Sequence, residues 1–137
     1  MVLLFDRYNM PEDVFEVIFA TKQQVIVAKA LIEYIKENQG EVTKTEMSLF
    51  ATELHEGHLE TEIDEPAYKG KRVKLSYNKR QFYDRILTPM KSMGLIDYDM
   101  YKKTYKLSDK FYNEVLQIGI MWKQELQKSV HVLKTKK

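Results

Sequence analysis

The chain has 137 residues, of which 44% are apolar and 31% charged, and it contains no cysteine. This balance is typical of one globular domain over residues 1–137 and excludes a disordered chain, a disulfide scaffold and a thiolate metal site. No apolar run approaches the roughly 18 residues of a membrane helix and no basic leader precedes residues 2–5, so we expect a soluble, cytoplasmic protein that makes no membrane contact.

The charges divide the chain into two halves of opposite sign. Residues 1–66 carry 14 acidic and 5 basic side chains, a net charge of −9, whereas residues 67–137 carry 6 acidic and 17 basic side chains, a net charge of +11. A basic half of this kind is an electrostatic footprint for a polyanion. We expect the acidic half to lie away from that polyanion or against a partner.

A short helix is predicted near the start of the chain. Pro11 and the two acidic residues after it are typical of a first helical turn, with Asn9 or Met10 as the cap. Apolar residues follow on nearly every side as far as Phe19. This pattern predicts a short buried helix.

Two capping boxes mark the next helices. Thr21 with Gln24, and Thr43 with Glu46, have the spacing at which side chain and backbone cap each other reciprocally. Apolar residues then recur at helical spacing after each box. The predicted elements are a helix ending at 38–40, a short strand at 41–42 and a helix ending near His55.

Residues 56–74 separate this helix from the next one. A helix-turn-helix ordinarily has only a few residues at this point. Apolar and charged residues alternate at 59–64 and 72–75, with turn-forming residues at 65–70 between them. We interpret the segment as an inserted hairpin with one acidic and one basic arm; a disordered loop is the alternative.

The segment 76–107 joins a polar helix to a small basic hairpin. Ser76 is expected to cap the helix, and at 100° per residue Phe82, Ile86, Met90 and Met93 share its inner face. Pro89 is expected to kink the helix near its end, because it lacks a donor and crowds the preceding turn. An extended run after residue 94, a turn at 99–102 and a return through 103–107 complete the hairpin.

The outward face of this helix has the chemistry of a DNA reader. Arg and Gln pair with guanine and adenine in the major groove, and a basic rim binds phosphates. Lys69–Arg85 holds seven basic residues against one acid, although a solvated face and, for the hairpin lysines, edge protection are alternatives. We expect Arg80, Gln81, Asp84 and Thr88 over base edges, Ser76, Tyr77, Asn78, Lys79 and Arg85 on the DNA backbone, and Lys102 and Lys103 on phosphate or in the minor groove.

The order of elements over residues 21–107, together with the junction Met93-Gly94-Leu95-Ile96, resembles winged helix-turn-helix proteins, in particular MarR-like and archaeal winged helix regulators, including those of archaeal viruses and plasmids. This resemblance implies a mainly α fold with a small β wing (α+β), a recognition helix at about 77–92 and a wing at 95–107. It also implies a homodimer held by terminal helices. A shorter wing without an Asp-x-Arg signature, and the longer segment 56–74, depart from the MarR pattern.

A final helix is expected to start at Ser108-Asp109 and to run to about Leu133, within residues 108–134. Its apolar face is too wide for one small core, so we expect part of it to pack on the domain and part on a second copy. The residues expected along this dimer seam are Phe111, Val115, Ile118, Trp122, Leu126 and Leu133.

Little in the sequence indicates catalysis. His55 and His58 lie among carboxylates and are weak candidates for a metal site, but no third ligand is fixed by spacing. The sequence shows no phosphate-binding glycine loop and no nucleophile elbow, so we expect neither an enzyme nor a cofactor.

These observations predict a homodimer that binds double-stranded DNA sequence-specifically and regulates transcription. A DNA-binding protein of plasmid or viral replication or partition is one alternative, and a winged helix that binds another protein is a second. Frequent Lys, Ile and Tyr residues without cysteine suit a thermophilic archaeon or its virus.

Overall fold

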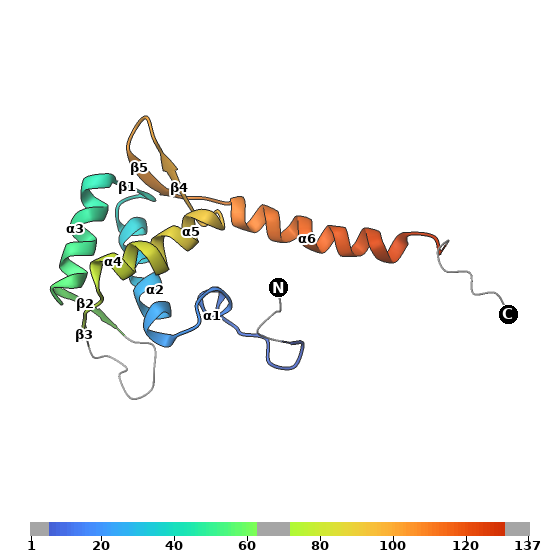
Figure 1. Ribbon diagram of the computed structural model, residues 1–137, viewed down its shortest axis with the longest axis horizontal. Helices are drawn as coiled ribbons and strands as arrows, with labels where there is room; N and C mark the ends of the chain where they lie inside the picture. Colours follow the sequence, from blue (N-terminus) through green and yellow to red (C-terminus); the bar gives the residue numbers. More distant parts are fainter. Residues whose placement is uncertain (1–5, 63–71, 131–137) are drawn as a thin grey trace.

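The computed structural model describes residues 6–62 and 72–130 of the chain (Figure 1). The described residues form helices and two small antiparallel sheets, and the last helix is long, which agrees with the α+β prediction. The elements are α1 (Val14–Ile18), α2 (Lys22–Glu37), β1 (Glu41–Thr43), α3 (Lys44–His55), β2 (Leu59–Glu62), β3 (Arg72–Leu75), α4 (Lys79–Gln81), the π-helical η2 (Phe82–Leu87), α5 (Thr88–Ser92), β4 (Ile96–Asp99), β5 (Thr104–Leu107) and α6 (Lys110–Gln127).

Both predicted capping boxes are present. The Thr21 hydroxyl accepts the Gln24 N–H at 3.2 Å, and the Gln24 side chain accepts the Thr21 N–H at 3.3 Å. Thr43 and Glu46 make the same reciprocal pair at 3.0 and 2.9 Å. Because each box satisfies two amides that a helix leaves unpaired, α2 and α3 begin where the sequence predicts.

Helix α1 differs from its prediction in both start and burial. Asp13, not Asn9 or Met10, is its cap, and the Asp13 carboxylate accepts the Phe15 N–H at 2.8 Å. The same carboxylate pairs with Lys29 of α2, whose hydrogen bond lowers the pKa of Asp13. No residue of α1 is buried, because only one side of this single turn and a half meets the body. Val14 and Val17 are exposed.

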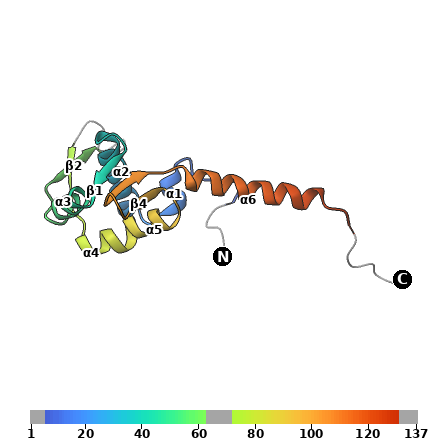
Figure 2. The ribbon, with the colours of Figure 1, turned by 90° about the horizontal axis from the view of Figure 1, so that it is seen from above.

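The core lies between the helices and the three-stranded sheet, whose strand order is β1-β5-β4. We call α4, η2 and α5 together the 79–92 helix, because they follow one another without a break. Figure 2 shows α2, α3 and this helix gathered at one end of the molecule, beside the sheet. The side chains with 0% exposure are Val27, Ala28, Leu31, Ile35, Met47, Ala51, Leu54, Phe82, Ile86, Met90 and Ile96.

The predicted inserted hairpin is present where the structure describes it. Strands β2 and β3 pair antiparallel, with Leu59 opposite Leu75 and Glu60 opposite Lys74. Leu75 is buried and Leu59 packs against the core, so the strand ends next to the helices are fixed to the body. The predicted turn and adjoining residues, 63–71, lie outside the described residues.

Helix α6 leaves the body and extends away from it (Figures 1 and 2). It is joined to the body at its first turn, where the Phe111 N–H donates to the Gly94 carbonyl at 3.1 Å and the Lys110 amine pairs with Asp97 at 2.9 Å. The helix ends at Gln127 and not near Leu133 as predicted, since Lys128 is extended. Ser and Val follow at 129–130, and both form helix poorly.

Candidate nucleic-acid interface

The 79–92 helix begins with two side-chain caps. Asn78 is its N-cap, and the Asn78 side chain accepts the Gln81 N–H at 3.1 Å. From α3, the Nδ1 atom of His55 accepts the Lys79 N–H at 3.0 Å. The predicted cap at Ser76 is therefore wrong. A residue 24 positions away in sequence helps to set where this helix starts.

A π-helical segment occupies the middle of the 79–92 helix, where the sequence predicts only a kink at Pro89. The Thr88 N–H donates to the Tyr83 carbonyl, five residues back. Pro89 explains the wider turn, because its ring crowds the carbonyl of Arg85 and it offers no N–H. With 3.6 residues per turn, side chains four residues apart in an α-helix do not point in the same direction. The π-helical turn holds more residues and brings such side chains closer to one line along the helix. The buried side chains of the helix thus keep one common face.

The outward face of the 79–92 helix is polar and open. Arg80 and Asp84 form an ion pair at 3.8 Å, with side chains 91% and 66% exposed. Such a pair contributes less than about 1 kcal/mol, so both groups are available to another partner. The exposed residues on this face are Arg80, Gln81, Asp84, Arg85 and Thr88, all of them expected at the interface.

Two of the residues expected on the DNA backbone make contacts within the protein. Tyr77 is buried in the core with 7% exposure, so its hydroxyl does not belong to an outward contact surface. Lys79 is half-buried, and its amine donates to the hydroxyls of Thr52 at 2.9 Å and Ser48 at 3.4 Å. Ser76 is exposed, with its carbonyl accepting from the Gln23 side chain at 3.4 Å.

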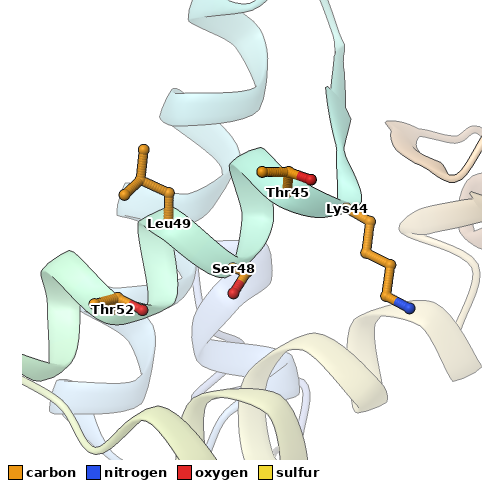
Figure 3. Close-up of a pocket in the computed structure, with 5 residues that line it drawn as sticks. All are labelled: Lys44, Thr45, Ser48, Leu49 and Thr52. Atoms are coloured by element: carbon orange, nitrogen blue, oxygen red, sulfur yellow. The ribbon is translucent and has the colours of Figure 1, made fainter.

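Helix α3 adds a polar surface that sequence reasoning missed. An open depression of about 440 Å³ is lined by Lys44, Thr45, Ser48, Leu49 and Thr52. Figure 3 shows Lys44 and Ser48 pointing to the side of α3 on which another helix lies. A lysine amine and several hydroxyls are the donors that bind phosphate oxygens. The signal in the sequence is the spacing of Thr45, Ser48 and Thr52, which places three hydroxyls on one helix face.

The β4–β5 hairpin is fixed to the end of the 79–92 helix. The Lys91 amine lies 5.7 Å from the ring centre of Tyr98 and 5.8 Å from that of Tyr105, and the two rings are 4.6 Å apart. Burial, with smaller contributions from neighbouring tyrosines, raises the pKa of Tyr105. Lys102 and Lys103 in the turn are exposed, as expected. These contacts fix the base of the hairpin to the last turn of the 79–92 helix.

Neither a protein-family model, nor a curated protein, nor a solved structure matches this chain. Its own surface chemistry is what bears on its function.

The histidines expected as weak metal ligands are used otherwise. His55 caps the 79–92 helix, whereas the Nδ1 atom of His58 faces Glu53 at 3.2 Å and Glu56 at 3.4 Å. Within residues 6–62 and 72–130, no three His, Cys, Asp or Glu side chains are grouped closely enough to hold a metal ion. No helix in these same ranges is both long enough and apolar enough to span a membrane.

Helix α6 presents a second candidate interface. Phe111 is half-buried at the body, and every residue from 112 to 130 is exposed. Most helical stability in proteins comes from packing of an apolar face, and beyond its first turn α6 packs on none of the described residues, so its apolar face is a candidate contact surface. Leu133 and the tail 134–137 lie outside the described residues. The expected seam residues that the structure describes beyond the body are Val115 (51% exposed), Ile118 (61%), Trp122 (63%) and Leu126 (67%).

Proposed function

We propose that this chain is a winged helix-turn-helix protein that binds double-stranded DNA sequence-specifically as a homodimer and regulates transcription. In this proposal the 79–92 helix enters the major groove and the β4–β5 hairpin is the wing. The observation that carries it is the exposed face of Arg80, Gln81, Arg85 and Thr88 on a helix whose other side is fully buried. That face offers Arg and Gln for base edges on a rigid support.

The surrounding charges support the same proposal. Lys102 and Lys103 lie exposed on the hairpin, and Lys44 lies on the depression of α3. With Arg80 and Arg85 they make five cations for phosphates, which predicts a slope of log affinity against log salt of about −4 to −5 per subunit. Tyr77 is withdrawn from the proposed contacts because it is buried. The hydroxyls of Thr45, Ser48 and Thr52 on α3 are added to the proposed phosphate contacts.

The direct test measures duplex affinity against salt, first for a duplex selected from random sequences and then for a scrambled one. Arg80→Ala should weaken binding to the selected duplex roughly tenfold to a hundredfold and relax specificity at one base pair. The scrambled duplex should lose much less. Arg7→Ala is the matched control, since Arg7 is an exposed arginine before α1, and it should change neither affinity. Absence of salt-sensitive duplex binding by the parent protein would refute the proposal.

The location of the selected sites decides between two DNA-binding roles. Single sites near promoters support transcriptional regulation. Repeated sites in an array would instead indicate a plasmid or viral protein of replication or partition.

The homodimer is proposed from α6. The same apolar stripe exists on every copy, so two α6 helices satisfy each other in a two-fold contact. Ile118 and Gly119 lie midway between the body and the end of α6, and nothing lies within 4 Å of the position where a Cβ would be on Gly119. An antiparallel pair would place Ile118 of one copy near Gly119 of the other and Trp122 near Val115. Since the helix is about 27 Å long, the two bodies would lie at opposite ends of the helix pair.

Sedimentation velocity tests the dimer. The parent protein should be a dimer, and Trp122→Glu should be a monomer with reduced helix content, because the unpaired α6 is marginal in water. Gln117→Glu introduces the same charge on the opposite side of α6, and this control should stay dimeric. A monomeric parent would refute this part of the proposal.

A protein-interaction module is the second candidate function, because Val14 and Val17 of α1 are exposed. A chain of that kind would bind no duplex even at low salt.

A further inference from the structure

The tip of the β4–β5 hairpin exposes an apolar side chain next to an aromatic one. Met100 is 77% exposed and Tyr101 is 99% exposed. Figure 1 shows the hairpin projecting from the body. Side chains this exposed contribute little to folding, because burial of apolar area is what stabilises a fold. Both side chains are therefore available to an external partner.

The backbone of this tip is held in place. The Asp99 carboxylate accepts the N–H of Tyr101 at 2.9 Å and that of Lys102 at 3.0 Å. These backbone hydrogen bonds, that of Lys102 first, lower the pKa of Asp99, so the carboxylate is charged at neutral pH. Lys103 has a positive φ of 55°, and its carbonyl accepts the Lys44 N–H at 2.9 Å. A fixed backbone presents the tip side chains at low entropic cost.

The base of the hairpin ties this tip to the proposed recognition helix. Lys91 of α5 lies over the rings of Tyr98 and Tyr105 in β4 and β5. A helix placed in the major groove would therefore also set the position of the tip relative to the duplex. The neighbouring groove on the duplex is the minor groove.

The composition of the tip matches the minor groove better than it matches a phosphate backbone. Lys102 and Lys103 supply charge that attracts DNA. Of Met100 and Tyr101, only the Tyr101 hydroxyl can donate a hydrogen bond to a phosphate oxygen. Minor-groove proteins insert apolar side chains between base steps and kink the duplex. Aromatic rings stack on bases regardless of sequence.

We propose that Tyr101 and Met100 form a wedge that enters the minor groove and partly unstacks one base step. This inference rests on the proposed function and adds a bend and a preference for deformable steps. Pyrimidine–purine steps such as TA and CA unstack most readily, so the selected duplex should carry one at the wing position.

The test uses the full-length protein and the selected duplex, labelled at its ends for energy transfer and carrying 2-aminopurine at the step expected under the wing. Parent protein should increase energy transfer and 2-aminopurine fluorescence, because the duplex bends and the base loses its stacking. Tyr101→Ala should lose both signals and roughly tenfold in affinity, with an unchanged salt slope. Lys102→Ala should instead reduce the magnitude of the slope by about 0.9 and keep both signals.

Tyr8→Ala is the matched control, because Tyr8 is 89% exposed on the segment before α1. It should leave affinity, bend and fluorescence unchanged. Thermal unfolding of Tyr101→Ala should match that of the parent, since no buried contact is removed.

The outcomes separate this inference from the proposed function. If the parent binds the duplex and Tyr101→Ala bends and unstacks it equally well, the wedge is wrong and DNA binding stands. The same holds if Tyr101→Ala loses affinity but keeps both signals, since the tyrosine would then be a surface contact only. If the parent binds no duplex, both proposals fall.

Discussion

Replacing Gly94 by Ala tests how α6 is attached to the body. Gly94 follows the 79–92 helix with a positive φ of 84°. A Cβ at this position would lie 2.9 Å from the Cβ of Lys110 and 3.0 Å from the backbone N of Phe111. The neighbouring atoms belong to the backbone and the first side-chain carbon of α6, so they cannot move unless the helix moves.

Two costs add in the Gly94→Ala variant. The left-handed conformation costs an alanine about 1–2 kcal/mol, and overpacking against α6 adds about 1–3 kcal/mol. Gly40→Ala measures the conformational cost alone, because Gly40 has a similar φ of 86° and no atom lies within 4 Å of the position where its Cβ would be. Urea unfolding followed by circular dichroism should give a loss of about 1–2 kcal/mol for Gly40→Ala and about 2–5 kcal/mol for Gly94→Ala.

Equal losses of stability in the two alanine variants would refute this reasoning. They would mean that the first turn of α6 does not lie against Gly94 in solution, and the direction in which α6 leaves the body would not be fixed there. A larger loss for Gly94→Ala supports the close contact. It should also weaken dimer formation, because the proposed seam depends on the direction of α6.

Four further substitutions test other parts of the structure. Thr43→Ala removes a capping box and should cost about 1 kcal/mol in urea unfolding. Phe82→Ala leaves a cavity in the core and should cost about 3–5 kcal/mol by the same measurement. The hydrogen bond from Lys110 lowers the pKa of Asp97. The charged carboxylate therefore stabilises the fold above the unfolded-state pKa of about 3.9, and this stabilisation is lost as pH falls through the folded-state pKa. Asp97→Asn should lower the urea midpoint at pH 7 and flatten the decline of the midpoint below about pH 4. Asp84→Asn removes the only acid of the proposed contact face, so binding to scrambled duplex should tighten while discrimination between duplexes falls in competition assays.

Much of the fold could be predicted from the sequence because its signals are local. The capping boxes at Thr21 and Thr43 each join residues three positions apart, so the hydrogen bonds that start α2 and α3 can be read directly from the chain. The two faces of the 79–92 helix follow from helical periodicity, and Phe82, Ile86 and Met90 are buried as predicted. Met93, also predicted on the inner face, is the C-cap of the helix and is only half-buried.

Contacts between distant segments set features of the candidate interface that helical periodicity alone does not predict. Tyr77 and Lys79 look like ordinary interface residues in a basic run, yet one enters the core and the other reaches the hydroxyls of Ser48 and Thr52. Tyr77 continues the period-two alternation in which Leu75 is buried and Lys74 and Ser76 are exposed, a local signal that the prediction of a helix from Ser76 missed. The prediction that Ser76 caps the 79–92 helix was also wrong because of a distant contact, since His55 of α3 accepts the Lys79 N–H.

The sequence by itself determined the helix starts, the hairpin strands, the polar face of the 79–92 helix and the charge division of the chain. Hydrogen bonds between near neighbours and the period of each element govern these features. Only the tertiary structure decided which polar side chains remain exposed and how the π-helical turn orients the polar face of the 79–92 helix. It also decided that α6 leaves the body with its apolar stripe exposed. Burial is a property of segments that meet in space, and the partners of Tyr77, Lys79 and α6 are not their neighbours in the chain.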